Sequence, residues 1–138
     1  MENRHPIVGV GAVIVNDGKV LLVQRGKPPG RGIWAIPGGR LRWGERLEEA
    51  VRREICEETG LEIELGEIAG VKDLIERDGS EIAYHYVLID FYAKPIGGQL
   101  EPGSDALDAR WVVPDLDHLQ DYELSRTTTE LLTELFDR

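Results

Sequence analysis

Residues 38–61 read GGRLRWGERLEEAVRREICEETGL, and most of this stretch has the periodicity of one amphipathic helix. Its apolar residues recur every three or four positions and so share one helical face: Leu47, Ala50, Val51 and Ile55. Gly60 follows where a C-terminal cap is expected. The pattern predicts a helix over Glu45–Thr59 with one side buried.

The polar face of this helix concentrates negative charge. Glu54, Glu57 and Glu58 stand at i, i+3 and i+4, so their side chains share one patch. Like charges at this spacing destabilise an isolated helix by roughly 0.2–0.5 kcal/mol per pair. A solvated acidic face is one interpretation. The other is a site for a hard divalent cation such as Mg²⁺, which binds carboxylate oxygens and keeps waters that a phosphate can replace.

The segment before the helix is basic. Seven of the sixteen Lys and Arg residues lie within residues 19–46: Lys19, Arg25, Lys27, Arg31, Arg40, Arg42 and Arg46. A Gly-rich basic loop beside an acidic helix suits a polyanion held by metal and arginines together, and Arg25 and Arg31 are the candidate phosphate contacts. The alternative is a solvated loop with scattered charge.

The rest of the chain predicts strands around this helix. Apolar runs separated by turn residues indicate strands at Pro6–Val15, Lys19–Gln24, Ile33–Ile36, Glu62–Ile75, Ile82–Tyr92 and Ala109–Val113. Pro37-Gly38-Gly39 is predicted to be a turn, and residues 94–104 a long loop. A second amphipathic helix is expected at Ser125–Phe136. The prediction is a mixed sheet covered by helices, in the α/β or α+β class.

Composition narrows the function. At 138 residues, with 41% hydrophobic residues, the chain is expected to form a single domain over residues 1–138. Cys56 alone excludes an internal disulfide and a multi-cysteine metal site, and it fits a cytoplasmic location. A net charge of −10 argues against nucleic acid and anionic lipid as partners. The apolar run Ile7–Val15 is too short to span a membrane.

The helix and its flanks resemble the Nudix box. Gly39, Glu45 and the run Arg53-Glu54-Ile55-Cys56-Glu57-Glu58-Thr59-Gly60-Leu61 match the box at every defined position. The opening hairpin, residues 32–39 and residues 109–112 are similar to Nudix hydrolases as well. The resemblance implies an α/β/α Nudix sandwich that hydrolyses a nucleoside diphosphate linked to another moiety, with Mg²⁺ or Mn²⁺.

The resemblance also implies roles for individual residues. Glu54, Glu57 and Glu58 would be metal ligands, helped by the backbone carbonyl of Gly38. Arg53 would orient the glutamates, so Glu54, Glu58 and Arg53 are the candidate catalytic residues. The candidate substrate-binding residues are Arg25, Arg31, Gly39, Glu45 and Asp105, with Glu45 at the edge of the site as a possible further ligand.

Several alternatives stay open. The general base is either a box glutamate (Glu54 or Glu58, which we favour) or a later loop acid (Glu101 or Asp105). ADP-ribose or a related nucleotide sugar is the first candidate substrate, and a (d)NTP, oxidised or not, the second. A non-catalytic nucleotide sensor is a rival, although such modules tend to lose the box glutamates. The oligomeric state also stays open, with a homodimer as one candidate because many Nudix relatives form dimers.

The remaining aromatic and sulfur side chains predict mostly structural roles. Trp34 and Trp111 lie in strand-like contexts and are expected in the core. For Trp43 and Tyr84, stacking on a nucleobase is the less favoured alternative. His85 is expected to be structural, and Cys56, at a variable position of the box, to be chemically silent.

Overall fold

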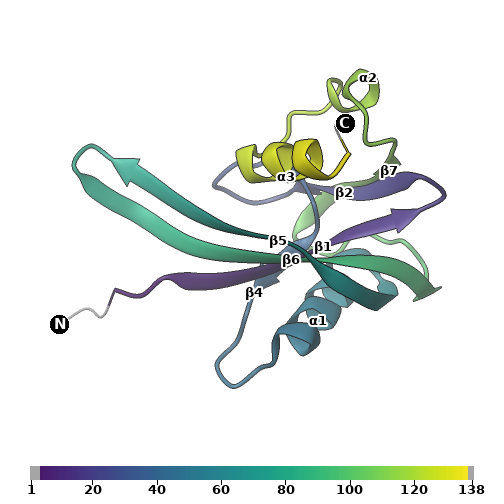
Figure 1. Ribbon diagram of the computed structural model, residues 1–138, viewed down its shortest axis with the longest axis horizontal. Coiled ribbons are helices and arrows are strands. Elements are labelled where there is room, and N and C mark those ends of the chain that lie inside the picture. The colour runs from purple at the N-terminus through teal and green to yellow at the C-terminus, as the bar shows by residue number, and fades with distance from the viewer. Residues whose placement is uncertain (1–3, 137–138) are drawn as a thin grey trace.

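Seven strands form one mixed sheet in the computed structural model, which describes residues 4–136 (Figure 1). The strands are β1 (Ile7–Asn16), β2 (Lys19–Arg25), β3 (Trp34–Ala35), β4 (Gly38–Arg40), β5 (Leu61–Asp78), β6 (Glu81–Gly98) and β7 (Ala106–Val112). The helices are α1 (Leu47–Thr59), α2 (Leu116–Leu119) and α3 (Arg126–Phe136). This arrangement confirms the predicted mixed sheet with flanking helices.

β1 organises the sheet. The main path runs β3-β2-β1-β6-β5, with β4 paired to β1 and β7 paired to β2. β1 and β6 pair in parallel, and the other pairs are antiparallel. The β1–β2 hairpin turns at Asp17 (φ 51°) and Gly18 (φ 72°), the left-handed conformations that an Asp-Gly hairpin turn requires. Short β4 is placed by pairing with β1 over Gly9–Gly11.

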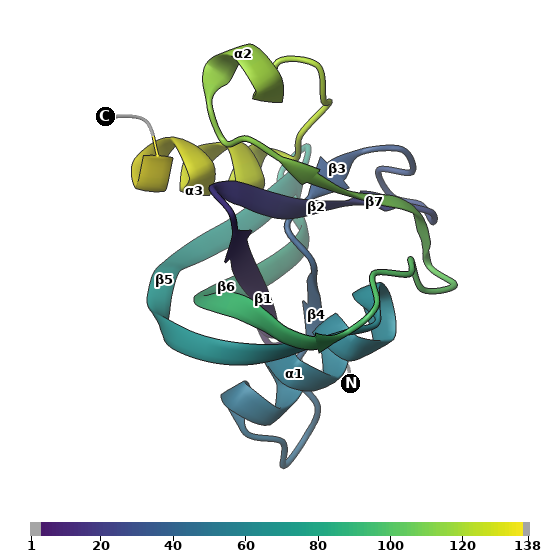
Figure 2. The ribbon, with the colours of Figure 1, turned by 90° about the vertical axis from the view of Figure 1, so that its right-hand side faces the viewer.

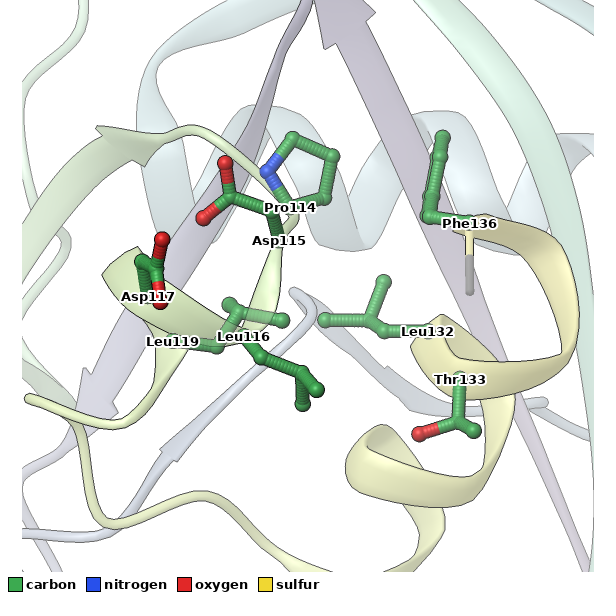
Figure 3. Close-up of a pocket in the computed structure, with 8 residues that line it drawn as sticks. All are labelled: Pro114, Asp115, Leu116, Asp117, Leu119, Leu132, Thr133 and Phe136. Atoms are coloured by element: carbon green, nitrogen blue, oxygen red, sulfur yellow. The ribbon is translucent and has the colours of Figure 1, made fainter. Parts of the chain in front are cut away.

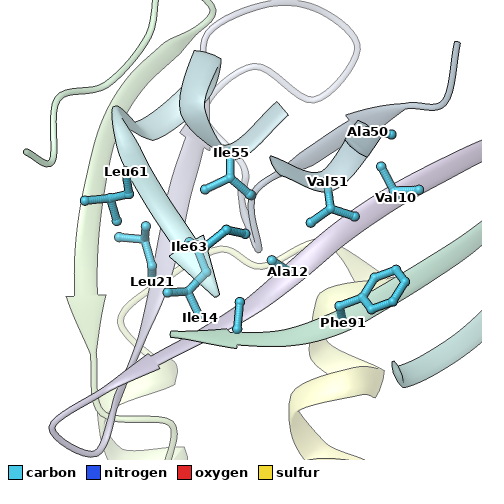
Figure 4. Close-up of a cluster of buried hydrophobic side chains, with 11 residues drawn as sticks. Val10, Ala12, Ile14, Leu21, Ala50, Val51, Ile55, Leu61, Ile63 and Phe91 are labelled. Carbon is cyan, nitrogen blue, oxygen red and sulfur yellow. The ribbon is translucent and has the colours of Figure 1, made fainter. Parts of the chain in front are cut away.

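Helices cover both faces of the sheet (Figure 2). On one face α1 buries Ala50, Val51 and Ile55 against β1, β5 and β6, as the predicted periodicity requires (Figure 4). On the other face α3 buries Leu131 and Leu132 in a second apolar cluster with β1 and β2. The first cluster fixes α1 against the sheet, so the orientation of its polar face is determined.

The structure corrects four local predictions. Gly38 and Gly39 belong to a strand instead of a turn, because their backbones pair with β1. Residues 94–98 continue β6 where a loop was predicted, since β5 pairs with them. Helix α2 was not predicted; its N-terminus is capped by the Asp115 side chain. α1 begins at Leu47, two residues later than predicted, because Glu45 turns its side chain back to Arg42 and Arg53.

The tryptophan predictions agree with the structure. Trp34 is 7% exposed in the α3-side cluster, and Trp111 packs partly buried against the α1-side cluster. Trp43 is fully exposed, and the Cys56 thiol lies on the surface.

Candidate active site

The polar face of α1 lines a pocket of about 330 Å³. Its walls come from one turn of α1 and from the loop after β6: Glu54, Glu57, Glu58, Gly103, Ser104 and Asp105. The structure therefore brings Asp105 to the three helix glutamates, although it follows them by more than 40 positions in the chain. Glu101 is outside this lining, so of the two loop acids only Asp105 is placed at the pocket.

Arg53 holds the carboxylates in place. Its guanidinium donates to Glu45 through Nε at 2.7 Å and Nη2 at 2.9 Å, a two-pronged contact. Nη1 donates to Glu54 at 2.6 Å and to Glu57 at 3.4 Å, and Nη2 also reaches the carbonyl of Arg40 at 3.0 Å. One side chain thus ties three glutamates to β4, in the arrangement that the sequence resemblance implies.

Glu45 serves this arginine from outside the pocket. It accepts hydrogen bonds from Arg53 and from the Arg42 amide, and these bonds lower the pKa of its carboxyl to about 2. The same contacts raise the pKa of Arg53 above its usual range. Because both donor groups hold the Glu45 oxygens, and Glu45 does not line the pocket, the structure places it as a support of Arg53.

Gly39 lets α1 approach β4 closely, and Gly38 lets β4 approach β1. A Cβ on Gly39 would lie 2.2 Å from the Glu54 carboxyl carbon, and one on Gly38 would lie 2.2 Å from the Val10 carbonyl oxygen. Any side chain at Gly39 would therefore displace Glu54. The Pro-Gly-Gly run, which composition alone marked as a turn, is glycine-rich because backbone and carboxylate meet there.

The loop after β6 is fastened to the end of α1. The amides of Glu101 and Gly103 donate to the carbonyls of Thr59 and Glu58, each at 2.8 Å. These carbonyls belong to the last turn, where a helix cannot satisfy them itself. The loop is thereby held at the pocket with Asp105 on its wall. Sequence reasoning missed Gly103 and Ser104, and no local pattern marks them, because their role comes from tertiary contact.

Comparison with known proteins agrees with this geometry. The model of the NUDIX domain matches residues 5–131. The chain belongs to the Nudix family. It is 42% identical over 115 residues to an ADP-ribose pyrophosphatase of Methanocaldococcus jannaschii, covering 83% of this chain and 65% of that protein. The chain therefore spans just under two thirds of that relative's length.

Two further relatives cover more of their own length. Nucleoside triphosphatase NudI of Escherichia coli is 34% identical over 131 residues, covering 87% of this chain and 89% of that one. The crystal structure of a MutT Nudix hydrolase from Burkholderia pseudomallei superposes with a TM-score of 0.83 at 32% identity, covering 96% of this chain and 99% of that chain. The sheet and its flanking helices are thus those of Nudix proteins.

The Nudix pocket carries uncompensated negative charge. The pKa of Glu58 is raised to about 7, chiefly by burial and in addition by the nearby charges of Glu54 and Asp105. A backbone hydrogen bond from Gly38 and the charge of Arg25 act in the opposite direction without cancelling the burial effect. A cation bound among these oxygens would relieve this repulsion, and carboxylates are the donors that Mg²⁺ and Mn²⁺ prefer.

The carboxylates do not form a finished metal cage. Among residues 4–136, no three acidic, His or Cys side chains lie close enough together to enclose an ion. Arg53 holds Glu54, and Glu57 is half-exposed beside Arg53 and Arg42. An open set of oxygens nevertheless fits magnesium, which completes its octahedron with water and substrate phosphates.

The structure separates the predicted basic contacts. Arg25 is close enough for its charge to act on Glu58, and its Nε donates to the Pro29 carbonyl at 2.9 Å. Lys27 pairs with Asp105 at 2.7 Å and so reaches the rim of the pocket. Arg31 is exposed and does not line the pocket.

A second cavity of about 320 Å³ lies between α2 and α3 (Figure 3). Its lining is mixed, with Leu116, Leu119, Leu132 and Phe136 beside the polar Asp115, Asp117 and Thr133. Asp115 is committed to capping α2 and to His118 at 2.6 Å. This cavity shares no residue with the carboxylate pocket. Within residues 4–136, the helices are too short or too polar to cross a membrane.

Proposed function

We propose that this chain is a Nudix pyrophosphohydrolase that uses Mg²⁺ or Mn²⁺ to cleave a nucleoside diphosphate linked to another moiety. The observation that carries the proposal is the pocket that Glu54, Glu57, Glu58 and Asp105 line together, while Arg53 holds two of these glutamates. A solvated acidic face would need neither the arginine network nor the glycines that admit Glu54.

In the proposed reaction the metal ion and the protein residues have different roles. Bound magnesium or manganese would supply charge to the phosphate oxygens and lower the pKa of an attacking water. Glu54, Glu57 and Glu58, with the Gly38 carbonyl, would hold the ion. Arg53 would keep the carboxylates in one orientation, so that they need not reorganise during the reaction. A manganese-bound relative from Francisella tularensis shares the fold at a TM-score of 0.73.

Residues around the pocket would handle the proton and the phosphates. The base that takes the proton of the attacking water would be Glu54 or Glu58, with Asp105 as the alternative from the loop. Arg25 would contribute positive charge near Glu58 for a phosphate, and Lys27 could exchange its Asp105 partner for one. Arg31, which is exposed and outside the pocket lining, stays a proposed phosphate contact, and Gly39 would act by leaving room for Glu54.

ADP-ribose or a related nucleotide sugar is the proposed substrate. The support is the 42% identity to a protein described as an ADP-ribose pyrophosphatase. A (d)NTP is the second candidate, supported by the 34% identity to a nucleoside triphosphatase over nearly the whole chain. A homodimer and a cytoplasmic location are also proposed for this chain.

Product analysis separates the candidates. The purified chain is incubated with Mg²⁺ and a panel that includes ADP-ribose, nucleotide sugars, dNTPs and 8-oxo-dGTP. ADP-ribose hydrolysis releases AMP and ribose 5-phosphate, whereas a (d)NTP releases pyrophosphate and a monophosphate. Activity should disappear in excess chelator and return with added metal. Full turnover in chelator would exclude the metal-dependent mechanism, and binding without turnover across the panel would favour a sensor.

A further inference from the structure

An arginine and two tyrosines form a cluster on the sheet face opposite the helix glutamates. Arg40 Nη2 donates to the Tyr86 hydroxyl at 2.8 Å, and its guanidinium carbon lies 5.7 Å from the centre of that ring. Tyr84 packs edge-on against Tyr86, with ring centres 5.7 Å apart. Arg40 and Tyr84 are exposed, so the cluster is open to solvent.

Strand β1 lies between Arg40 on β4 and the tyrosines on β6, and it carries a glycine there. Arg40 is the register partner of Gly9, and Gly9 pairs with Leu88 on β6. A Cβ on Gly9 would lie 2.8 Å from Leu88 and 3.8 Å from the Tyr86 ring. A side chain at Gly9 would therefore press on Leu88 and touch the ring that Arg40 contacts.

Arg40 directly follows Gly38 and Gly39 in the sequence. Gly39 faces Glu54, and successive residues of a strand point to opposite faces, so Arg40 points away from the carboxylates. Its carbonyl, in contrast, accepts from Arg53. At about 3.3 Å per residue along a strand, the side chain begins close to the pocket and extends across the other face.

Among the residues that the structure describes, no carboxylate pairs with the guanidinium of Arg40. Within residues 4–136 its polar contact is the neutral Tyr86 hydroxyl, although the chain carries 26 acidic residues. Most of its N–H donors and one planar face therefore remain available for a ligand. An arginine fixed by a phenol beside an aromatic ring offers a flat, charged surface on which a base can stack.

We propose that Arg40 binds the nucleobase of the substrate, with Tyr86 as its positioning residue and Tyr84 as the support of Tyr86. This rests on the proposed function, because a nucleoside attached to phosphates at the carboxylates would pass around the edge of β4 that is not paired with β1 to reach Arg40. The base stacks on the guanidinium plane. Tyr86 acts through Arg40 by holding that plane across Gly9.

Binding of two matched probes tests the assignment without turnover. AMP and ribose 5-phosphate share a sugar phosphate and differ by adenine. Their dissociation constants are measured by titration calorimetry with Mg²⁺ for the wild type, Arg40→Lys and Tyr86→Phe. Arg40→Lys keeps the charge and removes the plane, so AMP binding should weaken about 3- to 30-fold. Tyr86→Phe should weaken it about 2- to 5-fold, and ribose 5-phosphate binding should stay the same in both variants.

Two control variants distinguish a local role from general damage. His85→Ala alters the residue between the two tyrosines, on the opposite face of β6. Arg52→Lys makes the same chemical change on the exposed surface of α1. Both should bind AMP as the wild type does, and melting temperatures should show that all variants fold.

The outcomes separate this inference from the proposed reaction. Equal weakening of AMP and ribose 5-phosphate by Arg40→Lys, or full affinity for AMP, would overturn the nucleobase assignment. A wild type that binds AMP no better than ribose 5-phosphate would overturn it as well. If Arg40→Lys selectively weakens AMP binding but no nucleotide is hydrolysed, the proposed reaction is wrong and the assignment of Arg40 stands.

Discussion

The Arg53 side chain orients most of the glutamates at the pocket. It contacts Glu45, Glu54 and Glu57 and the backbone of β4, while Glu58 is left to burial and to its like-charged neighbours. Glu45, Glu54 and Glu57 are thus paired with Arg53, whereas Glu58 is not. A bound cation would therefore change the electrostatics of Glu58 more than those of Glu45.

Removing charge from the pocket should reduce the rate and leave the fold intact. Glu54→Gln and Glu58→Gln keep the size of the side chain and remove ligand charge, so kcat should fall by about 10²-fold or more. Glu49→Gln, an exposed change in the first turn of α1, should alter kcat little. The measurement is kcat at saturating metal beside the melting temperature without metal. Equal small losses for Glu54→Gln and Glu49→Gln would mean that the acidic face is merely solvated.

At the scale of elements, helices and strands with a local sequence period could be predicted. Segments whose conformation depends on tertiary contacts could not. The apolar period of α1 and the Asp-Gly turn after β1 are local signals, and both hold in the structure. β4 is three residues long with two glycines, and it becomes a strand only by pairing with β1. The glutamate spacing indicated one side of the pocket, but Asp105 arrives through a loop whose position depends on tertiary hydrogen bonds.

The end of α1 and the pocket loop should be energetically linked. Gly60 has φ 76°, and a Cβ there would lie 2.5 Å from the Gln99 carbonyl oxygen. Gly60→Ala should lower the free energy of unfolding by about 1–3 kcal/mol, since a residue with a side chain is strained in that conformation. Gly66→Ala is the control, because its Cβ would meet its nearest neighbour at 3.4 Å. Urea unfolding measures the stability of Gly60→Ala and Gly66→Ala. Equal losses of unfolding free energy in the two variants would contradict a link between the end of α1 and the loop after β6.

At the scale of the whole molecule, one buried carboxyl should shape the dependence of stability on pH. Asp90 is 8% exposed between β1 and β5, and burial raises its pKa from 3.8 to about 6, partly opposed by the charge of Lys72. The folded state favours protonated Asp90, so its stabilising contribution is complete below pH 3.8 and is lost as the pH rises through 6. The loss is of the order of 1–3 kcal/mol.

Asp90→Asn removes this titration. The variant minus wild-type difference in unfolding free energy should become more favourable to the variant between pH 4 and pH 7, on a scale of roughly 1–3 kcal/mol. Asp73→Asn, an exposed change on β5, should give a flat difference. Urea unfolding at several pH values measures both. A flat profile for Asp90→Asn would show that its carboxyl is solvated in the folded state.

Metal binding should stabilise the whole fold, because the ion would bind oxygens that only the folded chain brings together. A ligand specific to the folded state adds RT ln(1 + [L]/Kd), about 2.7 kcal/mol at a concentration of 100 Kd. With a net charge of −10 and Glu58 held among like charges, added Mg²⁺ or Mn²⁺ should raise the melting temperature at neutral pH without any substrate. Glu58→Gln should lose most of this rise, and Glu49→Gln should retain it. The same melts are repeated with calcium and with NaCl at matched concentration. General screening by salt should act equally on the wild type, Glu58→Gln and Glu49→Gln, whereas binding at the site should not. An identical rise in Glu58→Gln and Glu49→Gln would place the cation elsewhere on the acidic surface, even if the enzyme proves to require metal for turnover.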